Sequence, residues 1–308
     1  MKKFLKNCTL FLIPFVVAAI LAEIALRSTP NSYRYKYQWM QENADNVETL
    51  VFGSSHAIYG IRPEFFEGKT FNLANVSQGT KEDLWLLKHW SARYHRLRTI
   101  IVPISFFSLF SRGLEYGAES YRCRYYSIYM NCDLYPIWPQ YHLELSDYRT
   151  AKGKLGTFFY NMLVKPVGNG CDVYGWSDGN KLEGKDMKRW NDGSEAKAAI
   201  QRHTAKNWNY VEKNSQKLKE MAEYCKKRNI RMVLITTPCW HTYYDNLDKR
   251  QLSKMYEIIR QFQEDYNIPY FDYLKDSRFV ADDFYDSNHL SEFGAAKFSK
   301  ILNDDINK

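Results

Sequence analysis

Two continuous apolar runs constrain the fold of this chain more than any other feature of its sequence. Thr99–Ile104 and Arg231–Thr237 are rich in Ile, Val and Leu without polar alternation, and Pro238 ends the second run. Such runs are typical of strands that are covered on both faces, which occur mainly in parallel sheets. A chain that contains them therefore needs helices on both sides of its sheet.

Shorter segments of strand and helix character alternate with these two runs. Further strands are expected at about 47–53, 70–74 and 269–273, and helices at 81–96, 196–228, 252–266 and 295–302. In the segments expected to be helical, apolar residues recur mostly at spacings of three and four. The expected fold class is therefore α/β, with a mainly parallel sheet in a three-layer α/β/α arrangement.

Residues 107–195 interrupt this alternation. The segment is dense in aromatic residues, and Gly and Asp punctuate its second half. We interpret it as an aromatic-rich insertion that caps or flanks a site. Its aromatic side chains either stack on sugar rings or form a small core for a loop-rich segment. The second alternative is favoured, because aromatic side chains are buried more often than they bind ligands.

The N-terminus predicts a membrane segment. A basic stretch, residues 1–6, precedes the apolar run Cys8–Ala22, which Glu23 interrupts. Such a run is either a cleaved signal peptide or an uncleaved anchor, and a buried helix is the remaining alternative. No Ala-x-Ala triplet follows the apolar run, which favours the anchor.

The expected organisation is an anchor at 1–27, a juxtamembrane linker at 28–46 and one domain at 47–308. Basic residues before the apolar run favour a cytoplasmic N-terminus. The main domain is then expected outside the cytoplasm, in the cell envelope or periplasm, and it is secreted if the N-terminal segment is cleaved.

Composition excludes several classes of function. The 308 residues carry a formal net charge of +8, but Lys and Arg are scattered, so no nucleic-acid partner is expected. The six cysteines include no Cys-x-x-Cys, which argues against a zinc site or a redox dithiol. Cys123 and Cys132 are close enough for a local disulfide in an oxidising compartment. Glycine motifs that bind nucleotides are missing, so no cofactor is expected.

Three residues at opposite ends of the chain suggest a chemistry. Ser55 follows the first strand, while Asp286 and His289 precede the last helix. In a doubly wound sheet all three can meet at the carboxyl ends of the strands. A serine hydroxyl needs an imidazole to accept its proton, and a carboxylate orients that imidazole. The alternative is that Asp286 caps the final helix and His289 lies on the surface.

Other candidates are weaker. His56 is a rival base for Ser55, but it is expected to face the opposite side of the chain. The carboxylates near His289 could alternatively bind a metal ion, but nothing else in the sequence supports a metal site. Its members would be Asp282, Asp283, Asp286 and His289. Cys239 is an alternative nucleophile without an evident base.

The motifs resemble those of the SGNH/GDSL hydrolase superfamily. The first block is Gly53-Ser54-Ser55-His56, the second is Phe71-Asn72-Leu73-Ala74-Asn75, and the last is Asp286-x-x-His289-Leu290-x-x-x-Gly294-Ala295. They are most similar to membrane-anchored members, some of which act in O-acylation of cell-surface polymers, as alginate acetylation proteins do. The resemblance implies a flavodoxin-like fold, Ser55 as nucleophile, His289 as base and Asp286 as its orienting partner.

The resemblance also implies an oxyanion hole that includes the backbone N–H of Ser55. Where the family's second block has a glycine, this chain has Ser77, with Gly79 two residues later. The third block normally supplies an Asn, and here Ser105 stands nearby as a substitute donor. Loss of one such donor costs about 10²–10³ in rate.

The function expected from this resemblance is that of a serine esterase or O-acyltransferase acting on acetyl esters of a cell-surface glycan. The alternative is a non-catalytic glycan-binding or scaffold protein of an envelope polysaccharide assembly. Expected partners are the glycan or an acylated small molecule, the membrane, and envelope-assembly proteins.

Overall fold

The computed structural model describes residues 1–165 and 167–308. Five strands form one parallel sheet in the order β2-β1-β3-β4-β5, which is the flavodoxin-like order. They are β1 (Thr49–Val51), β2 (Thr70–Asn72), β3 (Thr99–Pro103), β4 (Arg231–Thr236) and β5 (Tyr270–Asp272). A separate antiparallel pair consists of β6 (Phe284–Asp286) and β7 (His289–Leu290). All five predicted strands are present, each within a few residues of its predicted bounds.

Thirteen α-helices accompany the sheets in the described part of the chain. They are α1 (Lys2–Ser28), α2 (Ser32–Asn43), α3 (Ser55–Gly60), α4 (Thr80–His89), α5 (Cys123–Tyr129), α6 (Pro139–His142), α7 (Tyr148–Leu163), α8 (Met187–Asn191), α9 (Ser194–His203), α10 (Val211–Lys227), α11 (His241–Tyr244), α12 (Lys249–Tyr266) and α13 (Glu292–Asn307). Short 3₁₀ turns connect several of them, and one of these, η5 (Glu144–Ser146), lies beside α1.

Side chains of the central strands alternate between two cores. Ile100 and Val102 pack with α4, α10 and α12 on one face, whereas Ile101 and Val233 pack with α3 and α13 on the other. These four side chains are at most 1% exposed. Burial on both faces confirms the predicted three-layer α/β class and explains why the strand sequences are continuously apolar.

Residues 28–46, predicted to be a juxtamembrane linker, are largely helical. They contain α2, which begins at the cap Asn31 and buries Tyr33, Lys36 and Met40 against the main core. Positions 33, 36 and 40 follow helical spacing, but the lysine among them obscures the apolar stripe.

The single helix predicted over 196–228 is two helices, α9 and α10. The break falls at 204–210, where Thr204 ends α9 and Trp208 is 37% exposed. Trp208 therefore does not belong to the buried stripe of α10, which consists of Leu218, Met221, Ala222 and Cys225.

The aromatic segment 107–195 contributes directly to the main core instead of forming a small core of its own. Tyr126, Tyr129 and Tyr135 are at most 5% exposed and pack in the same cluster as the central strands. Cys123 and Cys132 also lie in this cluster, and neither forms a disulfide.

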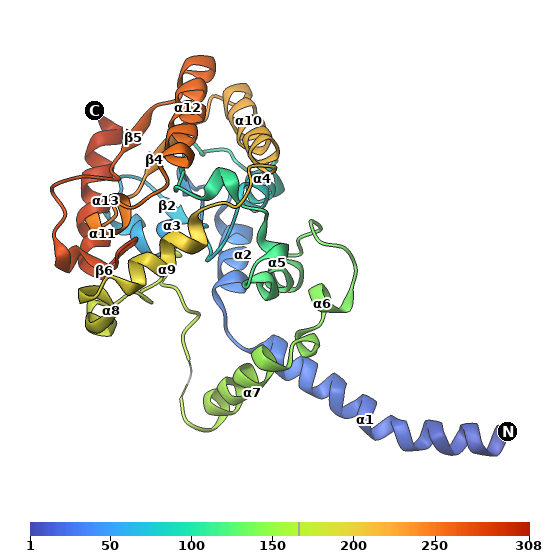
Figure 1. Cartoon of the computed structure of the whole chain (residues 1–308). Helices are drawn as coiled ribbons and strands as arrows, with labels where there is room; N and C mark the ends of the chain where they lie inside the picture. The colour runs from blue at the N-terminus through green and yellow to red at the C-terminus, as the bar shows by residue number, and fades with distance from the viewer. Residues whose placement is uncertain (166) are drawn as a thin grey trace.

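Helix α1 projects from the domain (Figure 1). It is the one helix in the described residues that is long and apolar enough to cross a membrane, as an anchor or as a signal sequence would.

Candidate active site

Ser55 lies where the first strand turns into a helix at the carboxyl edge of the sheet. It is the first residue of α3, and the backbone of Phe52 still donates to Ile101 of β3, 2.9 Å away. The first N–H groups of a helix have no partner within that helix. The chain therefore presents both the hydroxyl and the N–H of Ser55 at the place where open α/β folds bind ligands.

Gly53 makes this turn possible. Its φ of +107° lies where side chains are disfavoured, and a Cβ there would stand 3.2 Å from Cδ of Pro103. Its N–H donates to Asp83 Oδ1 at 3.0 Å, and its carbonyl accepts from the N–H of Asn75 at 3.2 Å. The strand end is thereby fixed to α4 and to the loop that follows β2.

Replacing Gly53 with Ala is expected to lower the free energy of unfolding by about 1–3 kcal/mol, because an alanine is strained at this φ. Gly153→Ala is a matched control, since no atom lies within 4 Å of the added Cβ in the interior of α7. That change is expected to stabilise by roughly 0.5–1 kcal/mol. Urea unfolding of the detergent-solubilised chain measures both, and an unchanged midpoint for Gly53→Ala contradicts the prediction.

The structure brings Ser55, His289 and Asp286 together. Oγ of Ser55 lies 2.8 Å from Nε2 of His289, and Nδ1 of His289 lies 3.0 Å from both carboxylate oxygens of Asp286. A carboxylate only accepts hydrogen bonds, so Nδ1 carries the proton and Nε2 is free to accept from the serine hydroxyl. This is the tautomer that general-base activation of a serine requires.

Asp286 is ionised at neutral pH. Burial favours its neutral form, but His289 and the N–H groups of Asn288 and His289 outweigh burial and lower the pKa of Asp286 to about 2. A carboxylate with a lowered pKa stabilises the fold above its ordinary pKa of 3.8, and that contribution is lost as the pH falls towards 2.

Two contacts hold the loop that carries Asp286 and His289. Glu195 of α9 accepts from the N–H of Ser287 at 3.1 Å and from its hydroxyl at 3.0 Å. The N–H of Trp240 donates to the carbonyl of Ser287 at 2.8 Å. Asp286 does not cap the last helix, because the side chain of Ser291 has that role.

Of the three predicted oxyanion donors, Ser77, Gly79 and Ser105, one has a backbone N–H that donates to no other group in the described residues. The N–H of Gly79 donates to Glu82 Oε2 at 2.9 Å, and that of Ser105 donates to Ser108 Oγ at 2.9 Å. Ser77 has a φ of +61°, and its N–H donates to no group in the described part of the chain. Ser77 and Ser55 line the same cavity, so their two N–H groups are candidate oxyanion donors.

His56 is not a rival base, because it is fully buried behind the site and bonded to other groups. Its Nε2 accepts from the Asn288 amide at 3.1 Å, so its Nδ1–H donates to Ser105 Oγ at 2.8 Å. Burial, with His289 and His203 adding to the effect, holds the pKa of His56 well below its ordinary value. His56 follows Ser55 within α3, where successive side chains diverge by a helical step, not by the alternation of a strand.

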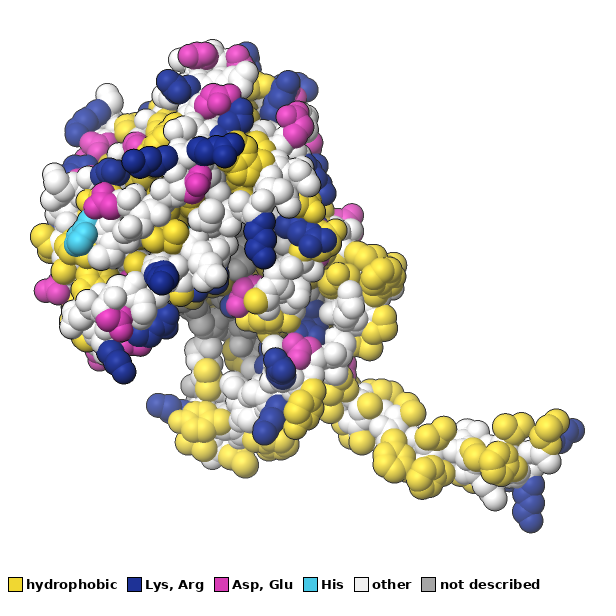
Figure 2. All heavy atoms as spheres, in the orientation of Figure 1, with side chains coloured by type: hydrophobic (Ala, Val, Ile, Leu, Met, Phe, Trp, Pro, Cys, Tyr) yellow, Lys and Arg dark blue, Asp and Glu magenta, His cyan; other side chains and the backbone are white. Residues whose placement is uncertain are grey.

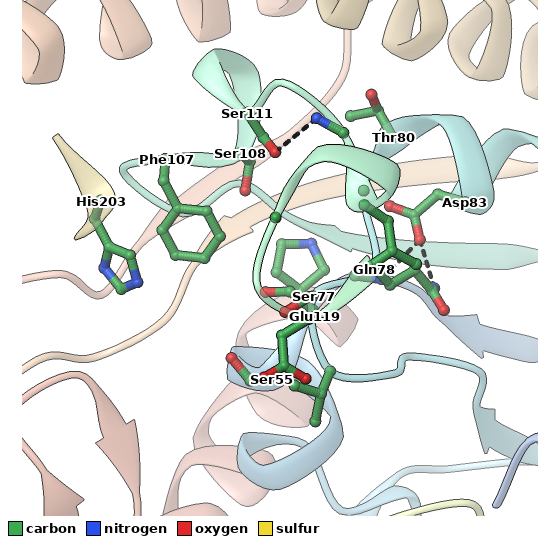
Figure 3. Close-up of a pocket in the computed structure, with 18 of the residues that line it drawn as sticks. Ser55, Ser77, Gln78, Thr80, Asp83, Phe107, Ser108, Ser111, Glu119 and His203 are labelled. Carbon is green, nitrogen blue, oxygen red and sulfur yellow. Dashed lines mark hydrogen bonds between the residues drawn. The ribbon is translucent and has the colours of Figure 1, made fainter. Parts of the chain in front are cut away.

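Ser55 and His289 line a cavity of about 470 Å³ that lies between the turn after β1, the loop after β2, the end of β3 and the first part of the 107–195 segment. Figure 3 shows Ser55, Ser77, Phe107 and His203 around it. Nδ1 of His203 lies 2.7 Å from the hydroxyl of Tyr243. Burial, with His289 and Arg202 nearby, lowers the pKa of His203 to about 3, so it is a neutral group in this wall.

Asp83 supports the same cavity from α4. Its Oδ1 accepts from the N–H of Gly53 and, at 2.7 Å, from the amide of Gln78 (Figure 3). Burial raises the pKa of Asp83 to about 7. A carboxyl group that holds its proton more tightly when folded stabilises the fold most at low pH. That contribution is lost as the pH rises from about 4 through about 7.

Asp83→Asn is expected to keep both hydrogen bonds, whereas Asp83→Ala is expected to lose about 1–3 kcal/mol because it leaves two buried donors unpaired. As the pH rises from 5 to 8, the free energy of unfolding should also fall less for Asp83→Asn than for the unsubstituted protein. Urea unfolding at the two pH values measures both effects. If the free energy of unfolding depends on pH equally in Asp83→Asn and in the unsubstituted protein, the pKa of Asp83 is not raised.

The remaining sequence candidates lie elsewhere. Cys239 is buried against Phe106 and Tyr243, and burial raises the pKa of its thiol, so it is not a nucleophile at neutral pH. Asp283 pairs with Lys297 at 2.7 Å. No group of three or more His, Cys, Asp and Glu side chains in the described residues is arranged to hold a metal ion.

Comparison with known proteins gives partial matches. A family model described as a protein of unknown function (DUF1574) matches residues 188–304, which include Asp286 and His289 but not Ser55. One similar solved structure is a crystal structure from Bacteroides fragilis NCTC 9343, described as a candidate acylhydrolase. It is 10% identical, with a TM-score of 0.42, and the match covers 88% of this chain and 94% of that one. No curated protein matches.

Proposed function

We propose that this protein is a serine esterase or O-acyltransferase of SGNH type. The observation that carries the proposal is the continuous chain of contacts from Ser55 Oγ through the His289 ring to Asp286, at the mouth of a cavity. Its support from sequence is the resemblance of the first and last motif blocks. The proposed chemistry requires no cofactor.

In the first half-reaction, Oγ of Ser55 attacks the ester carbonyl carbon while its proton passes to Nε2 of His289. The N–H groups of Ser55 and Ser77 stabilise the resulting oxyanion. The C–O bond of the ester then breaks, and His289 returns the proton to the leaving alcohol. Asp286 stabilises the imidazolium that forms between these two proton transfers. The product is an acyl group on Ser55.

In the second half-reaction, water or a sugar hydroxyl attacks the acyl-serine. His289 accepts the proton of the attacking group and then returns it to Ser55 Oγ as the acyl bond breaks. Water as the acceptor gives an esterase, and a sugar hydroxyl gives an O-acyltransferase. Both outcomes use the same residues, so the acceptor depends on what the cavity binds.

A glycan acceptor is supported by a second hollow that continues from the first. It shares Phe107, Arg202 and His203 with the triad cavity and extends past Tyr116 and Tyr210. Its volume is about 570 Å³. Flat aromatic faces next to charged groups are suited to sugar rings with polar substituents. We propose acetyl as the acyl group and a cell-surface glycan as the substrate, outside the cytoplasm, with α1 as the membrane anchor.

A serine-reactive fluorophosphonate probe tests the nucleophile. The full-length protein should be labelled, and Ser55→Ala should not, whereas Ser54→Ala, one residue away, should be labelled as well as the unsubstituted protein. Equal labelling of Ser55→Ala, or no labelling of the unsubstituted protein, overturns the proposal. Release of acetate from a chromogenic ester, with and without a glycan acceptor, then separates hydrolysis from transfer.

One observation favours a second candidate, a non-catalytic glycan-binding or scaffold protein. The N–H groups of Gly79 and Ser105 are both committed to other acceptors, which leaves fewer oxyanion donors than the family pattern provides. Polysaccharide binding that survives in Ser55→Ala, together with no esterase activity in the unsubstituted protein, would favour this candidate.

A further inference from the structure

The apolar side chains that the domain exposes are concentrated in one segment. Outside residues 1–28, the described residues expose eighteen large hydrophobic side chains, and eleven of these lie in residues 137–165 and 167. We call this segment the collar. Its exposed members are Ile137, Trp138, Leu143, Leu145, Tyr148, Phe159, Tyr160, Met162, Leu163, Val164 and Val167. Figure 2 shows hydrophobic side chains gathered over α7 and along α1. Apolar surface concentrated in this way marks an interaction site.

The collar is attached to the base of α1. The carboxylate of Glu23 in α1 accepts from the N–H groups of Glu144 and Leu145, each at 3.0 Å. Arg27 of α1 donates to the carbonyl of His142 at 2.6 Å. Helix α7 also lies against α1 (Figure 1). The segment that carries the exposed apolar side chains therefore lies beside the base of α1, where α1 leaves the domain.

A buried polar junction fixes α7 relative to the domain. The Glu144 side chain is fully buried, and its Oε1 accepts from Lys154 Nζ of α7 and from the Tyr129 hydroxyl of α5, each at 2.6 Å. The same glutamate supplies one of the N–H groups that Glu23 accepts. One residue thus connects α1, α5 and α7, so the direction of α1 sets the direction of the collar.

The charge of the collar is positive where its apolar residues are densest. Within the collar, residues 148–165 contain four Lys or Arg residues and no Asp or Glu, whereas its two acidic residues, Glu144 and Asp147, precede this stretch. Lys154 is engaged by Glu144, whereas Arg149, Lys152 and Lys165 form no salt bridge in the described residues. Cationic side chains beside Phe, Leu, Trp and Tyr are typical of segments that lie at the surface of an anionic bilayer.

We propose that the collar lies in the headgroup layer of the same bilayer that α1 spans. Its apolar side chains reach the acyl boundary, and Arg149, Lys152 and Lys165 bind anionic phospholipid headgroups. Helix α7 has 16 residues, which is too short to cross a bilayer, so it lies along the surface. The inference rests on α1 being a membrane anchor, as proposed above, and is independent of the triad chemistry.

Depth-dependent quenching in proteoliposomes tests the proposal. The full-length chain with Cys8→Ser and Cys171→Ser retains four cysteines, all buried. Single cysteines replace Leu163 in the collar, Ile13 in α1 and Glu264 in α12, and each carries an environment-sensitive fluorophore. The bilayer contains phosphatidylcholine and phosphatidylglycerol, with brominated acyl chains as the quencher.

The expected result is quenching at positions 13 and 163 but not at 264. Reversing the three cations (Arg149→Glu, Lys152→Glu, Lys165→Glu), or omitting phosphatidylglycerol, should reduce quenching at 163 and leave it unchanged at 13. Quenching at 13 without quenching at 163 overturns the proposed contact of the collar with the bilayer but agrees with α1 as a membrane anchor. Absence of quenching at 13 overturns the anchor itself. A label at 163 that is shielded from aqueous iodide but not quenched by brominated lipid indicates a protein partner instead, and also overturns the proposal.

Discussion

Alanine at Ser55 or at His289 is expected to lower kcat for a chromogenic acetyl ester by about 10⁴–10⁶, and the double variant should lose no more than the worse single variant. The physical reason is that the two side chains act as one unit, because the hydroxyl is a weak nucleophile without the imidazole 2.8 Å away. Steady-state kinetics of the detergent-solubilised full-length protein measure all three variants.

Two controls separate this effect from general damage to the site. Ser54→Ala changes the neighbouring serine, whose side chain forms no cap bond to α3. Ser77→Ala leaves the backbone N–H that we assign to the oxyanion hole. Both variants should keep most of the activity. If the double variant instead loses the product of the two single effects, Ser55 and His289 act independently and the triad assignment is wrong.

The central strands were predictable because burial on both faces leaves a signature within a few adjacent residues. Thr99–Pro103 and Arg231–Thr236 need no information from distant parts of the chain to be identified as buried strands. Helices α12 and α13 were predictable for the same reason, since their apolar residues recur at regular spacing. The fold class was therefore predictable from local sequence patterns.

Helix α2 escaped prediction because one of its buried positions is charged. Lys36 is fully buried, and its ammonium donates to the carbonyl of Ala74, in the loop that leads to Ser77. Burial lowers the pKa of Lys36 to about 8, although Cys171 and Asp172 partly offset this effect. An isolated sequence gives no sign that a lysine has such a distant acceptor, so the segment resembled a polar linker.

The residues of the candidate site also fall into those that local sequence patterns predict and those that only tertiary contacts place. Ser55, Asp286 and His289 were proposed from short local patterns at the two ends of the chain. Glu195 was not, because it reaches the site through hydrogen bonds from Ser287, 92 residues away. The position of His203 in the cavity wall likewise depends on how α9 packs against Tyr243. Local motifs identify candidate reactive groups, whereas tertiary structure identifies the groups that hold them in place.

The candidate oxyanion donors show what a motif comparison misses when residues differ. Comparison with the family pattern suggested Ser77 or Gly79 as the donor of the second block and Ser105 as a substitute near the third. The backbone distinguishes them, because Gly79 is the N-cap of α4 and Ser105 begins a turn that Ser108 closes. Ser105 instead binds His56, which in turn accepts from the amide of Asn288. A position that would supply an oxyanion donor in the family pattern therefore supports the loop that carries His289.

Asp286→Asn is expected to lower kcat by about 10⁴ with a much smaller change in KM. An asparagine amide that faces His289 Nδ1 donates a hydrogen bond, which forces the imidazole proton onto Nε2. The Ser55 hydroxyl then loses its acceptor although the geometry is unchanged. Steady-state kinetics with the acetyl ester measure the effect, and fluorophosphonate labelling of Ser55 should slow in parallel.

Asp282→Asn is the matched control, because Asp282 is exposed and lies four residues earlier on the same segment. It should retain full activity. Since the pKa of Asp286 is about 2, loss of activity on acidification to about pH 4 cannot come from protonation of this carboxylate. If Asp286→Asn keeps kcat within tenfold of the unsubstituted protein, Asp286 does not set the tautomer of His289. The site would then operate as a dyad of Ser55 and His289, with Asn288 as the neighbouring amide.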